Sequence, residues 1–252
     1  MFRQLPALSR LPAARGIHGV GFSNEYPGGY GELMALSEGF LLPVLNGLPT
    51  EHAALTEPMA VGVHAVAKAR LEPGDAPLVI GGPVGLAVIA ALRLRGAEPI
   101  VAADFSAARR GLAEKMGAHV VVDPAAGSSI GALGQAAGAR PAVIFECVGV
   151  PGLLHQLMRE APHSARIVVV GVCMEDDRIR PMLGINKELS LQFVLGYQPD
   201  EFADALAALA DGRIPAAPVV TGRVGVDGVA DAFRTLATPD AHAKILVEPW
   251  RR

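Results

Sequence analysis

Glycines gather at residues 81–85, Gly-Gly-Pro-Val-Gly, between an apolar run at 78–80 and a helical pattern at 86–94. A turn built from glycine can bring its backbone close to a ligand. The helix that follows directs free N–H groups and the positive end of its dipole toward the same point. A strand, a glycine turn and a helix in this order predict a pyrophosphate-binding site.

Asp104 lies 19 residues after Gly85, at the end of a second apolar strand. A carboxylate about 20 residues beyond the glycine turn can accept hydrogen bonds from an adenosine ribose, and it repels a 2′-phosphate. The turn and Asp104 together predict a dinucleotide half-site that prefers NAD to NADP.

The turn departs from the G-x-G-x-x-G pattern of dinucleotide sites. Either Ile80 stands in the first glycine position, or the loop is one residue shorter than the pattern. Both alignments keep the last two glycines, Gly82 and Gly85. The alternative interpretation is a tight strand-to-helix turn with no ligand.

Composition indicates a well-buried α/β protein. The chain has 252 residues, of which 51% are hydrophobic but only 5% aromatic, so Ala, Val, Leu and Ile form its core. Such a core suits a parallel sheet covered by helices on both faces. The net charge of −3 provides no basic field for nucleic acid or an anionic membrane. The longest apolar stretch, 78–92, is interrupted by glycine and proline and is too short to cross a bilayer.

Two cysteines, Cys147 and Cys173, are too few for a disulfide framework or a four-thiolate zinc site. Each ends an apolar run, so we interpret both as small core residues. The first sixteen residues contain three arginines and no acid, as transit peptides do, but two prolines spoil an amphipathic helix there. We interpret that segment as the start of a domain.

Strands alternate with helices through the middle of the chain. Besides 78–80 and the strand before Asp104, we predict strands at 119–122, 141–147, 167–170 and 189–195. Predicted helices cover 107–116, capped by Ser106 and stopped by Gly117, then 129–137, 151–160 starting at Pro151, and 200–209. This alternation predicts a doubly wound parallel sheet, a Rossmann fold, with Gly82, Asp104, Gly149 and Gly171 at the carboxyl ends of strands.

The two ends of the chain differ in character from the middle. Residues 17–50 suggest loops and short strands, including 30–34 and 40–44, before a helix capped by Thr50 and a helical pattern at 53–69 interrupted by Pro58. Residues 215–252 suggest a strand, a helix at 229–236 and a strand at 244–247, which we expect to pack on 17–60. The predicted domains are therefore 1–60, 61–213 and 214–252.

Several stretches match one family. They are PGGYGELM (27–34), TEPMAVGVHAV (56–66), VIGGPVGL (79–86), AADFSAARRGLAEKMGA (102–118), VIFECVG (143–149), IVVVGV (167–172), ELSLQFVLGY (188–197) and AKILVEP (243–249). The chain thereby resembles the zinc-type alcohol and polyol dehydrogenases of the medium-chain dehydrogenase/reductase family. The resemblance implies a Rossmann NAD-binding domain (61–213), a partial β-rich GroES-like catalytic domain (1–60), and a C-terminal return to that domain (214–252).

The resemblance also implies roles for individual residues. The cofactor-binding residues it implies are Gly81, Gly82, Pro83, Val84 and Gly85 for the phosphates, Asp104 and Arg109 for the adenosine ribose, Val148, Gly149, Val170, Gly171 and Val172 for the nicotinamide half, and Lys244 for the pyrophosphate. Arg109 could instead be a solvated helix residue, and Lys244 a surface charge. No catalytic side chain is assigned.

The metal half of the family pattern is largely missing. In zinc-dependent members a cysteine and a Gly-His-Glu histidine bind the catalytic metal, whereas this sequence has no cysteine before Cys147 and no Gly-His-Glu. Its first residues match a point where the family's catalytic domain is well advanced. Glu57 occupies the position of a third metal-proximal ligand, but one carboxylate cannot build a three-ligand zinc site. His18, His52 and His64 lack the family's ligand spacing, and His64 suits a packing role.

Three functions therefore stay open. The first is hydride transfer between an alcohol and NAD, impaired because the metal-ligand segment is absent. The second is a zinc-free enone or quinone reductase, with Tyr30 or Tyr197 as proton donor. The third is a non-catalytic NAD(H)-binding or interaction protein. We expect a cytoplasmic protein with a small alcohol or carbonyl substrate, no nucleic-acid or membrane partner, and homodimers or larger oligomers formed through strand 188–197.

Overall fold

The computed structural model describes residues 29–34, 36, 38–238 and 240–251. The expectations for residues 1–28, including the first sixteen residues and His18, lie outside this range. The chain forms two compact units, one of residues 61–195 and the other of the two chain ends, up to Ala60 and from Gly196 onward. Residues 196–213, which the sequence analysis assigns to the nucleotide domain, thus group with the chain ends.

A six-stranded sheet forms the centre of the 61–195 unit. Its strands are β1 (Ala76–Ile80), β2 (Val101–Ala103), β3 (Val120–Val122), β4 (Ala142–Glu146), β5 (Arg166–Val169) and β6 (Ser190–Phe193). Their order is β3-β2-β1-β4-β5-β6, and every neighbouring pair is parallel. The predicted doubly wound parallel sheet is confirmed.

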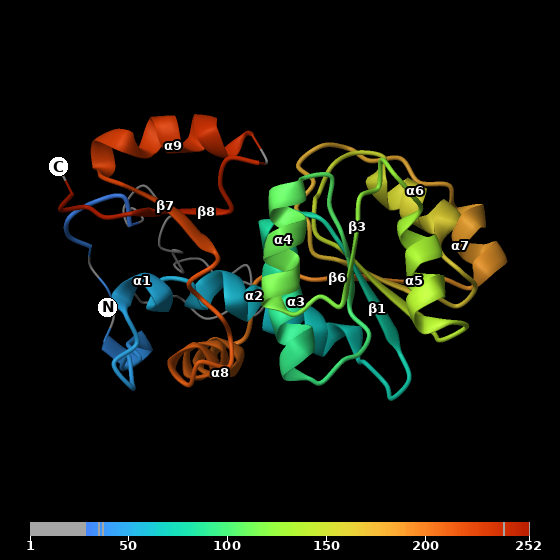
Figure 1. Cartoon of the computed structure of the whole chain (residues 1–252), viewed down its shortest axis with the longest axis horizontal. Helices are drawn as coiled ribbons and strands as arrows, with labels where there is room; N and C mark the ends of the chain where they lie inside the picture. The colour runs from blue at the N-terminus through green and yellow to red at the C-terminus, as the bar shows by residue number, and fades with distance from the viewer. Residues whose placement is uncertain (1–28, 35, 37, 239, 252) are drawn as a thin grey trace, which may run out of the picture. The chain divides into compact units, whose positions relative to one another are not determined.

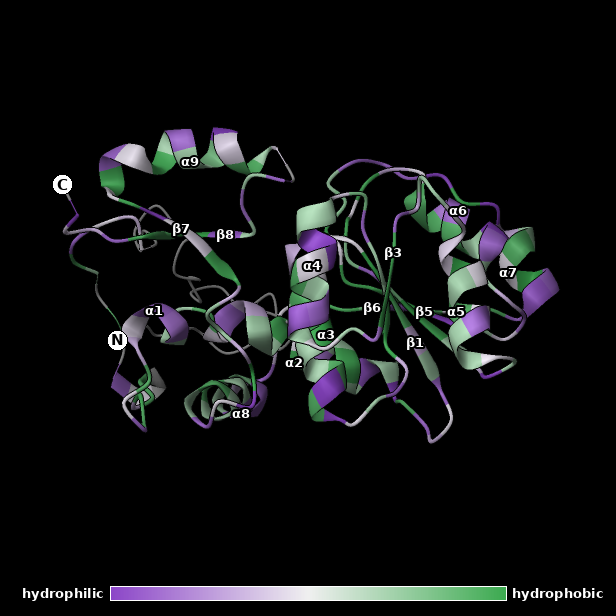
Figure 2. Cartoon of the chain, in the orientation of Figure 1, coloured by the Kyte–Doolittle hydropathy of each residue, from purple (hydrophilic) through white to green (hydrophobic). Residues whose placement is uncertain are grey.

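Helices cover both faces of this sheet. They are α2 (Thr56–Ala69, which begins in the other unit), α3 (Gly82–Leu94), α4 (Ala107–Met116), α5 (Ser129–Ala137), α6 (Leu153–Glu160) and α7 (Pro181–Lys187). Figure 1 shows α3 and α4 on one side of the sheet and α5 and α6 on the other. Leu78, Ile144 and Ile167 are fully buried in the cluster that packs under α5 and α6. Strands β1, β2 and β3 are wholly apolar, whereas β4, β5 and β6 include Glu146, Arg166, Ser190 and Gln192. The helices turn their polar residues outward (Figure 2).

The switch point of this topology lies at the carboxyl edge of the sheet, where the chain moves outward in opposite directions from the adjacent strands β1 and β4. Ile80 is in register with Ala103 on one side and Glu146 on the other. The glycine turn, Asp104 and the loops after β4 and β5 therefore meet at one edge.

The unit of the chain ends is less regular. It contains a short 3₁₀-helix η2 (Glu38–Phe40), α1 (Thr50–Ala53), α8 (Pro199–Ala210), β7 (Val220–Val224), η3 (Val226–Gly228), α9 (Val229–Leu236) and β8 (Lys244–Val247). Strands β7 and β8 form a parallel pair. Arg223 pairs with Glu51 at 2.7 Å, and the ring of Phe233 meets Tyr30 edge-on at 6.3 Å. The C-terminal segment therefore packs on the described part of the N-terminal region, as expected.

Some local predictions were wrong. Neither 30–34 nor 40–44 is a strand: 30–34 form bends and irregular chain, Phe40 ends η2, and 41–44 are irregular. Gly31 interrupts the first segment, and neither finds a pairing strand among the described residues. Pro49 precedes α1, so Thr50 is its first residue and not its cap. Helix α6 begins at Leu153 after Gly152, whose φ is +85°, so Pro151 lies in the preceding turn.

Helix α7 was not predicted, since it is short and contains a glycine.

Among the described residues no helix has the length and apolar character that crossing a membrane requires.

Candidate functional site

The glycine turn is shaped by its contact with the end of β4. Gly81 and Gly82 have φ angles of +62° and +73°, which side-chain-bearing residues avoid. A Cβ on Gly82 would lie 2.4 Å from the carbonyl oxygen of Cys147. Helix α3 starts at Gly82, four residues before the predicted Leu86, and Pro83 follows in its first turn. The N–H group of Val84 has no acceptor within the helix, so it is available to an anion.

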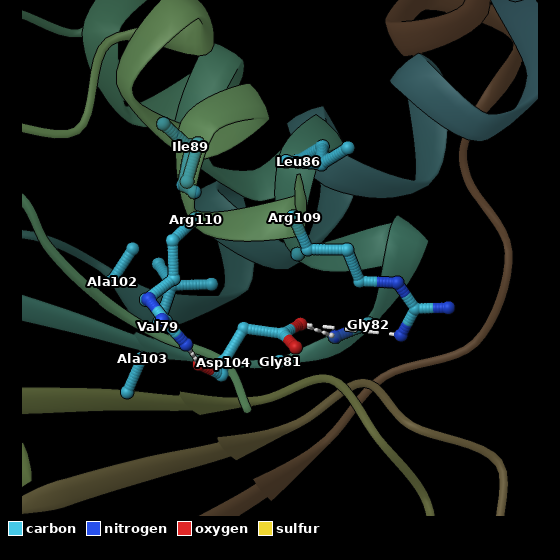
Figure 3. A pocket seen from close by; sticks show the side chains of 12 residues that line it. Val79, Gly81, Gly82, Leu86, Ile89, Ala102, Ala103, Asp104, Arg109 and Arg110 are labelled. Carbon is cyan, nitrogen blue, oxygen red and sulfur yellow. Dashed lines mark hydrogen bonds and ion pairs between the residues drawn. The ribbon is translucent and has the colours of Figure 1, made fainter. Parts of the chain in front are cut away.

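Asp104 follows β2 and faces this turn. Its Oδ2 accepts a hydrogen bond from the Gly82 N–H at 3.2 Å, and its Oδ1 accepts one from the Ser106 N–H at 2.8 Å. Figure 3 shows the carboxyl group directed at Gly82, with the Arg109 side chain reaching over the turn from α4. Each carboxyl oxygen keeps a further lone pair, which could accept from a ribose hydroxyl. The predicted proximity of Gly82 and Asp104 is therefore present.

Arg109 fills much of the space beside Asp104. Its Nη1 lies 4.0 Å from Asp104 Oδ2, and its side chain is 16% exposed. The cavity that these residues line with the turn has a volume of about 10 Å³, which is room for about one water. The Nε of Arg109 is buried with no partner within the described part of the chain. A ribose can bind at Asp104 only if the Arg109 guanidinium moves away from it. The Arg109 Nε–H could then donate a hydrogen bond to the ligand.

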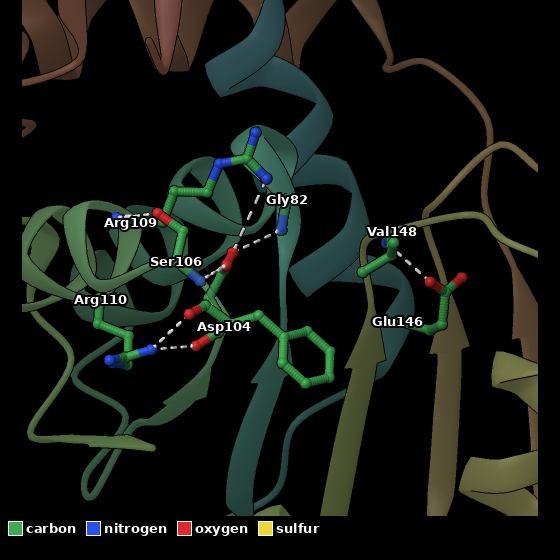
Figure 4. Close-up of polar contacts among 8 residues, drawn as sticks. Gly82, Asp104, Ser106, Arg109, Arg110, Glu146 and Val148 are labelled. Carbon is green, nitrogen blue, oxygen red and sulfur yellow. Dashed lines mark hydrogen bonds and ion pairs between the residues drawn. The ribbon is translucent and has the colours of Figure 1, made fainter. Parts of the chain in front are cut away.

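Ser106, expected from the sequence as a helix cap, and Arg110, which was not predicted as a site residue, hold Asp104 in place. Ser106 caps α4 by accepting from the Arg109 N–H at 3.1 Å. Arg110 donates to the carbonyl oxygens of Asp104 and Phe105, each at 2.8 Å, and pairs with Asp123 at 3.2 Å. These contacts fix the backbone around the carboxyl group (Figure 4). Nothing in the sequence distinguished Arg110 from its neighbour Arg109.

The residues assigned to the nicotinamide half also come together. A Cβ on Gly171 would lie 2.3 Å from the Gly149 nitrogen, so the loops after β4 and β5 touch through their glycines. Val148 and Val172 are 41% and 68% exposed, whereas Val170 is buried beneath them. Exposed valines beside a glycine turn offer an apolar surface to a planar ring.

Glu57 and Lys244 lie in the other unit, beside one pocket of about 580 Å³. The rest of its lining is mostly apolar and includes Tyr30, Leu42, Phe202 and Leu246. Burial raises the pKa of Glu57, and the nearby Lys244 ammonium lowers it in part. The structure thus places Lys244 and Glu57 beside the same pocket.

The tyrosines considered as proton donors are poorly suited to that role. Tyr30 is 60% exposed and contacts Phe233. Tyr197 is buried and its ring lies 5.4 Å from that of Phe202. Burial, together with the Glu57 carboxyl, raises the pKa of Tyr197, which makes it a weaker acid.

The donor set does not fit a catalytic zinc ion in the part of the chain that the structure describes. A zinc site of this kind needs three protein ligands and an open position. Within residues 29–34, 36, 38–238 and 240–251, no three His, Cys, Asp or Glu side chains cluster to hold a metal. Glu57 supplies one donor, and its charged neighbour is a cation.

Comparisons with known proteins agree with this architecture. The family model described as zinc-binding dehydrogenase matches residues 83–211, about half of the chain. (R,R)-butanediol dehydrogenase of Bacillus subtilis strain 168 is 33% identical over 88% of this chain and 64% of its own length. Sorbitol dehydrogenase of the same strain is 25% identical over 89% of this chain and 64% of its own. The chain thus spans a little under two thirds of these relatives.

Solved structures agree as well. The crystal structure of 2R,3R-butanediol dehydrogenase from Bacillus subtilis superposes with a TM-score of 0.78 at 32% identity, covering 88% of this chain and 65% of that one. A protein described as a zinc-binding dehydrogenase from Sinorhizobium meliloti 1021, solved bound to NADP, gives 0.82 at 26% identity, covering 98% of this chain and 76% of that one. This chain belongs to the zinc-binding dehydrogenase family.

Proposed function

We propose that this chain binds NAD(H) at the carboxyl edge of its sheet and supports hydride transfer between an alcohol and NAD. The observation that carries the proposal is the carboxyl group of Asp104, held by the Gly82 N–H at the start of α3. A carboxyl group in that place accepts from a ribose and repels a 2′-phosphate. Bound NAD would supply the hydride acceptor.

The chain's own residues divide the work of binding. The N–H group of Val84 takes the pyrophosphate, since it points out of the helix end and finds no intrahelical partner. Asp104 takes the ribose hydroxyls once Arg109 has moved aside. Val148 and Val172 offer apolar contacts to the nicotinamide ring, and their loops exclude water from one face of it.

The substrate class follows from the relatives. Two of them are named for butanediol and sorbitol, so we propose a small alcohol or polyol as substrate. Lys244 would contact the pyrophosphate. Alcohol oxidation would be feeble, because Glu57 supplies a single donor toward zinc among the described residues.

Self-association belongs to the same proposal. Strand β6 is an edge strand, and Phe193 and Leu195, at its end and just beyond it, are 63% and 55% exposed. An apolar edge invites pairing with another chain. We propose a homodimer through 188–197 in the cytoplasm, which sedimentation of the wild-type chain would check.

The test measures zinc content and then NAD⁺ reduction against a panel of alcohols and polyols. We expect a saturable titration of NADH together with slow or undetectable turnover. Fast turnover with one zinc per chain would contradict the impairment. Failure of NADH to bind at millimolar concentration would overturn the binding proposal itself.

A further inference from the structure

Glu146 is an acid in the interior of an apolar sheet. It ends β4, all five residues of which are buried, and it is itself only 3% exposed. Burying a carboxyl group is costly unless hydrogen bonds replace its water. Its sequence context, VIFECVG, contains no other charged residue, and this isolated acid is the signal that sequence reasoning overlooked.

The hydrogen bonds of Glu146 join two loops. Its side-chain Oε1 accepts from the N–H groups of Val148 at 2.7 Å and Gly149 at 2.8 Å. Its carbonyl oxygen accepts from the N–H groups of Val170 at 2.8 Å and Gly171 at 2.9 Å. Figure 4 shows the side chain curling toward the Val148 backbone. One residue therefore holds the loop after β4 through its side chain and the loop after β5 through its backbone.

These loops have little freedom to adjust. The loops after β4 and β5 are in close contact, since a Cβ on Gly149 would lie 2.6 Å from the Val172 nitrogen. Val148 Cγ2 lies 2.6 Å from the position that a Cβ of Gly81 would occupy. A shift of the loop after β4 would therefore move the exposed Val148 side chain against the glycine turn and separate it from Val172.

We propose that Glu146 is a positioning residue for the nicotinamide half of the cofactor. It does not touch the cofactor. It fixes the positions of the loops that carry Val148 and Val172 relative to each other. This inference rests on the proposed NAD(H) binding and adds to it the residue that shapes one half of the site. The adenosine half, built on Asp104 and Arg109, does not depend on Glu146.

Four variants separate positioning from general stability. Glu146→Ala removes the acceptor, and Glu146→Asp shortens it by one methylene, so that one oxygen no longer reaches both N–H groups. Glu146→Gln keeps an acceptor oxygen at full length and is the conservative rescue. Glu98→Gln, at a side chain 77% exposed near the opposite edge of the sheet, is the control.

Two ligands report on the two halves of the site. ADP occupies the adenosine half and the pyrophosphate position but leaves the nicotinamide half empty, whereas the fluorescence of NADH depends on the surroundings of its nicotinamide ring. We expect Glu146→Ala and Glu146→Asp to weaken NADH about tenfold and to lose the change in nicotinamide emission. ADP should bind within about twofold of wild type, because the two halves are independent. Glu146→Gln should stay within about threefold for NADH.

The affinities of the variants for NADH and ADP decide whether Glu146 positions the nicotinamide half. Wild-type NADH affinity and emission in Glu146→Asp would overturn the inference, even where Glu146→Ala does not fold. Equal loss of NADH and ADP would also overturn it, since that indicates a general structural role. If the wild-type chain binds neither ligand, the proposed function itself fails, and that result is distinct from both.

Discussion

Two pockets of this molecule each place a carboxyl group near a basic side chain, and the surroundings of the two carboxyl groups differ. Asp104 beside Arg109 accepts two backbone hydrogen bonds in a cavity of about 10 Å³. Glu57 beside Lys244 borders about 580 Å³ of space, and burial raises its pKa. The first carboxyl group is held in one geometry by backbone donors, whereas the second is desolvated, and the Lys244 ammonium favours its charged form in part. Preorganisation of that kind marks Asp104 as the better-formed ligand site.

The difference follows from where each acid lies in the fold. Asp104 directly follows β2 and faces the start of α3, so the backbone N–H groups of Gly82 and Ser106 lie within hydrogen-bond distance of its carboxyl group. Glu57 lies in the first turn of α2, near the edge of an irregular unit.

Substituting the turn glycine should be the most damaging change. In Gly82→Ala the new Cβ would lie 2.4 Å from the Cys147 carbonyl oxygen, so we expect a loss of about 2–4 kcal/mol of unfolding free energy and of NAD⁺ binding. Urea unfolding measures the first effect and calorimetry the second. Gly96→Ala is the matched control, because Gly96 has a similar φ of +68° but nothing within 4 Å. Equal losses in the two variants would show that backbone strain, and not the approach to β4, explains the glycine.

Removing the ribose acceptor should act on affinity more than on stability. Asp104→Ala should weaken NAD⁺ about tenfold or more and narrow its advantage over NADP⁺, because the carboxyl group both accepts from the ribose and repels a phosphate. Asp231→Ala, an exposed acid on α9, serves as the control. An unchanged ratio of the two affinities would show that Asp104 does not select the cofactor.

Arg109 should affect the two cofactors unequally. Arg109→Ala opens the space beside Asp104 but removes a guanidinium with an unused donor, so we expect NAD⁺ affinity to change by less than about threefold and NADP⁺ affinity to fall further. Titration of both cofactors against the variant measures this. A gain in NADP⁺ affinity would contradict it.

The smallest effect concerns Glu57 and pH. Its pKa is raised in the folded chain, so between its unfolded value near 4.5 and the folded value the folded state binds more protons. Stability from this group is therefore present below pH 4.5 and is lost as pH rises through the folded pKa. Glu57→Gln should be more stable than wild type at neutral pH, by less than about 1 kcal/mol after solvent screening, and equal to it below pH 4.5.

Lys244→Met sharpens that prediction. Without the ammonium the pKa of Glu57 should rise further, which widens the pH range over which stability is lost. Thermal unfolding between pH 4 and pH 8 tests both variants. A Glu57→Gln variant that parallels wild type at every pH would show that burial does not perturb this carboxyl group.

Helix caps, glycines and hydrophobic periodicity in the sequence predicted the elements whose ends depend on neighbouring residues alone. Ser106 and Gly117 mark the two ends of α4 as expected, with the hydroxyl accepting from the Arg109 N–H and Gly117 at φ +118°. Helix α9 and strand β8 have their predicted bounds. In each case a cap, a glycine or a hydrophobic period identifies the element without reference to the rest of the chain.

Features that depend on distant partners were not predictable. Residues 30–34 were predicted as a strand, but a strand needs a neighbour, and the described chain offers none there. The role of Glu146 depends on the register that brings Val170 and Gly171 beside it. The filling of the ribose site by Arg109 likewise arises from the packing of α4 on α3. Spacing in the sequence located Asp104 but not the groups that surround it.

The most direct test of the central claim is isothermal titration of the wild-type chain with NAD⁺ and with NADP⁺. We predict saturable binding of NAD⁺ at about one site per chain and binding of NADP⁺ at least about tenfold weaker. The difference in affinity between the two cofactors should be lost in Asp104→Ala. Binding of neither cofactor at millimolar concentration, or a preference for NADP⁺, would contradict it.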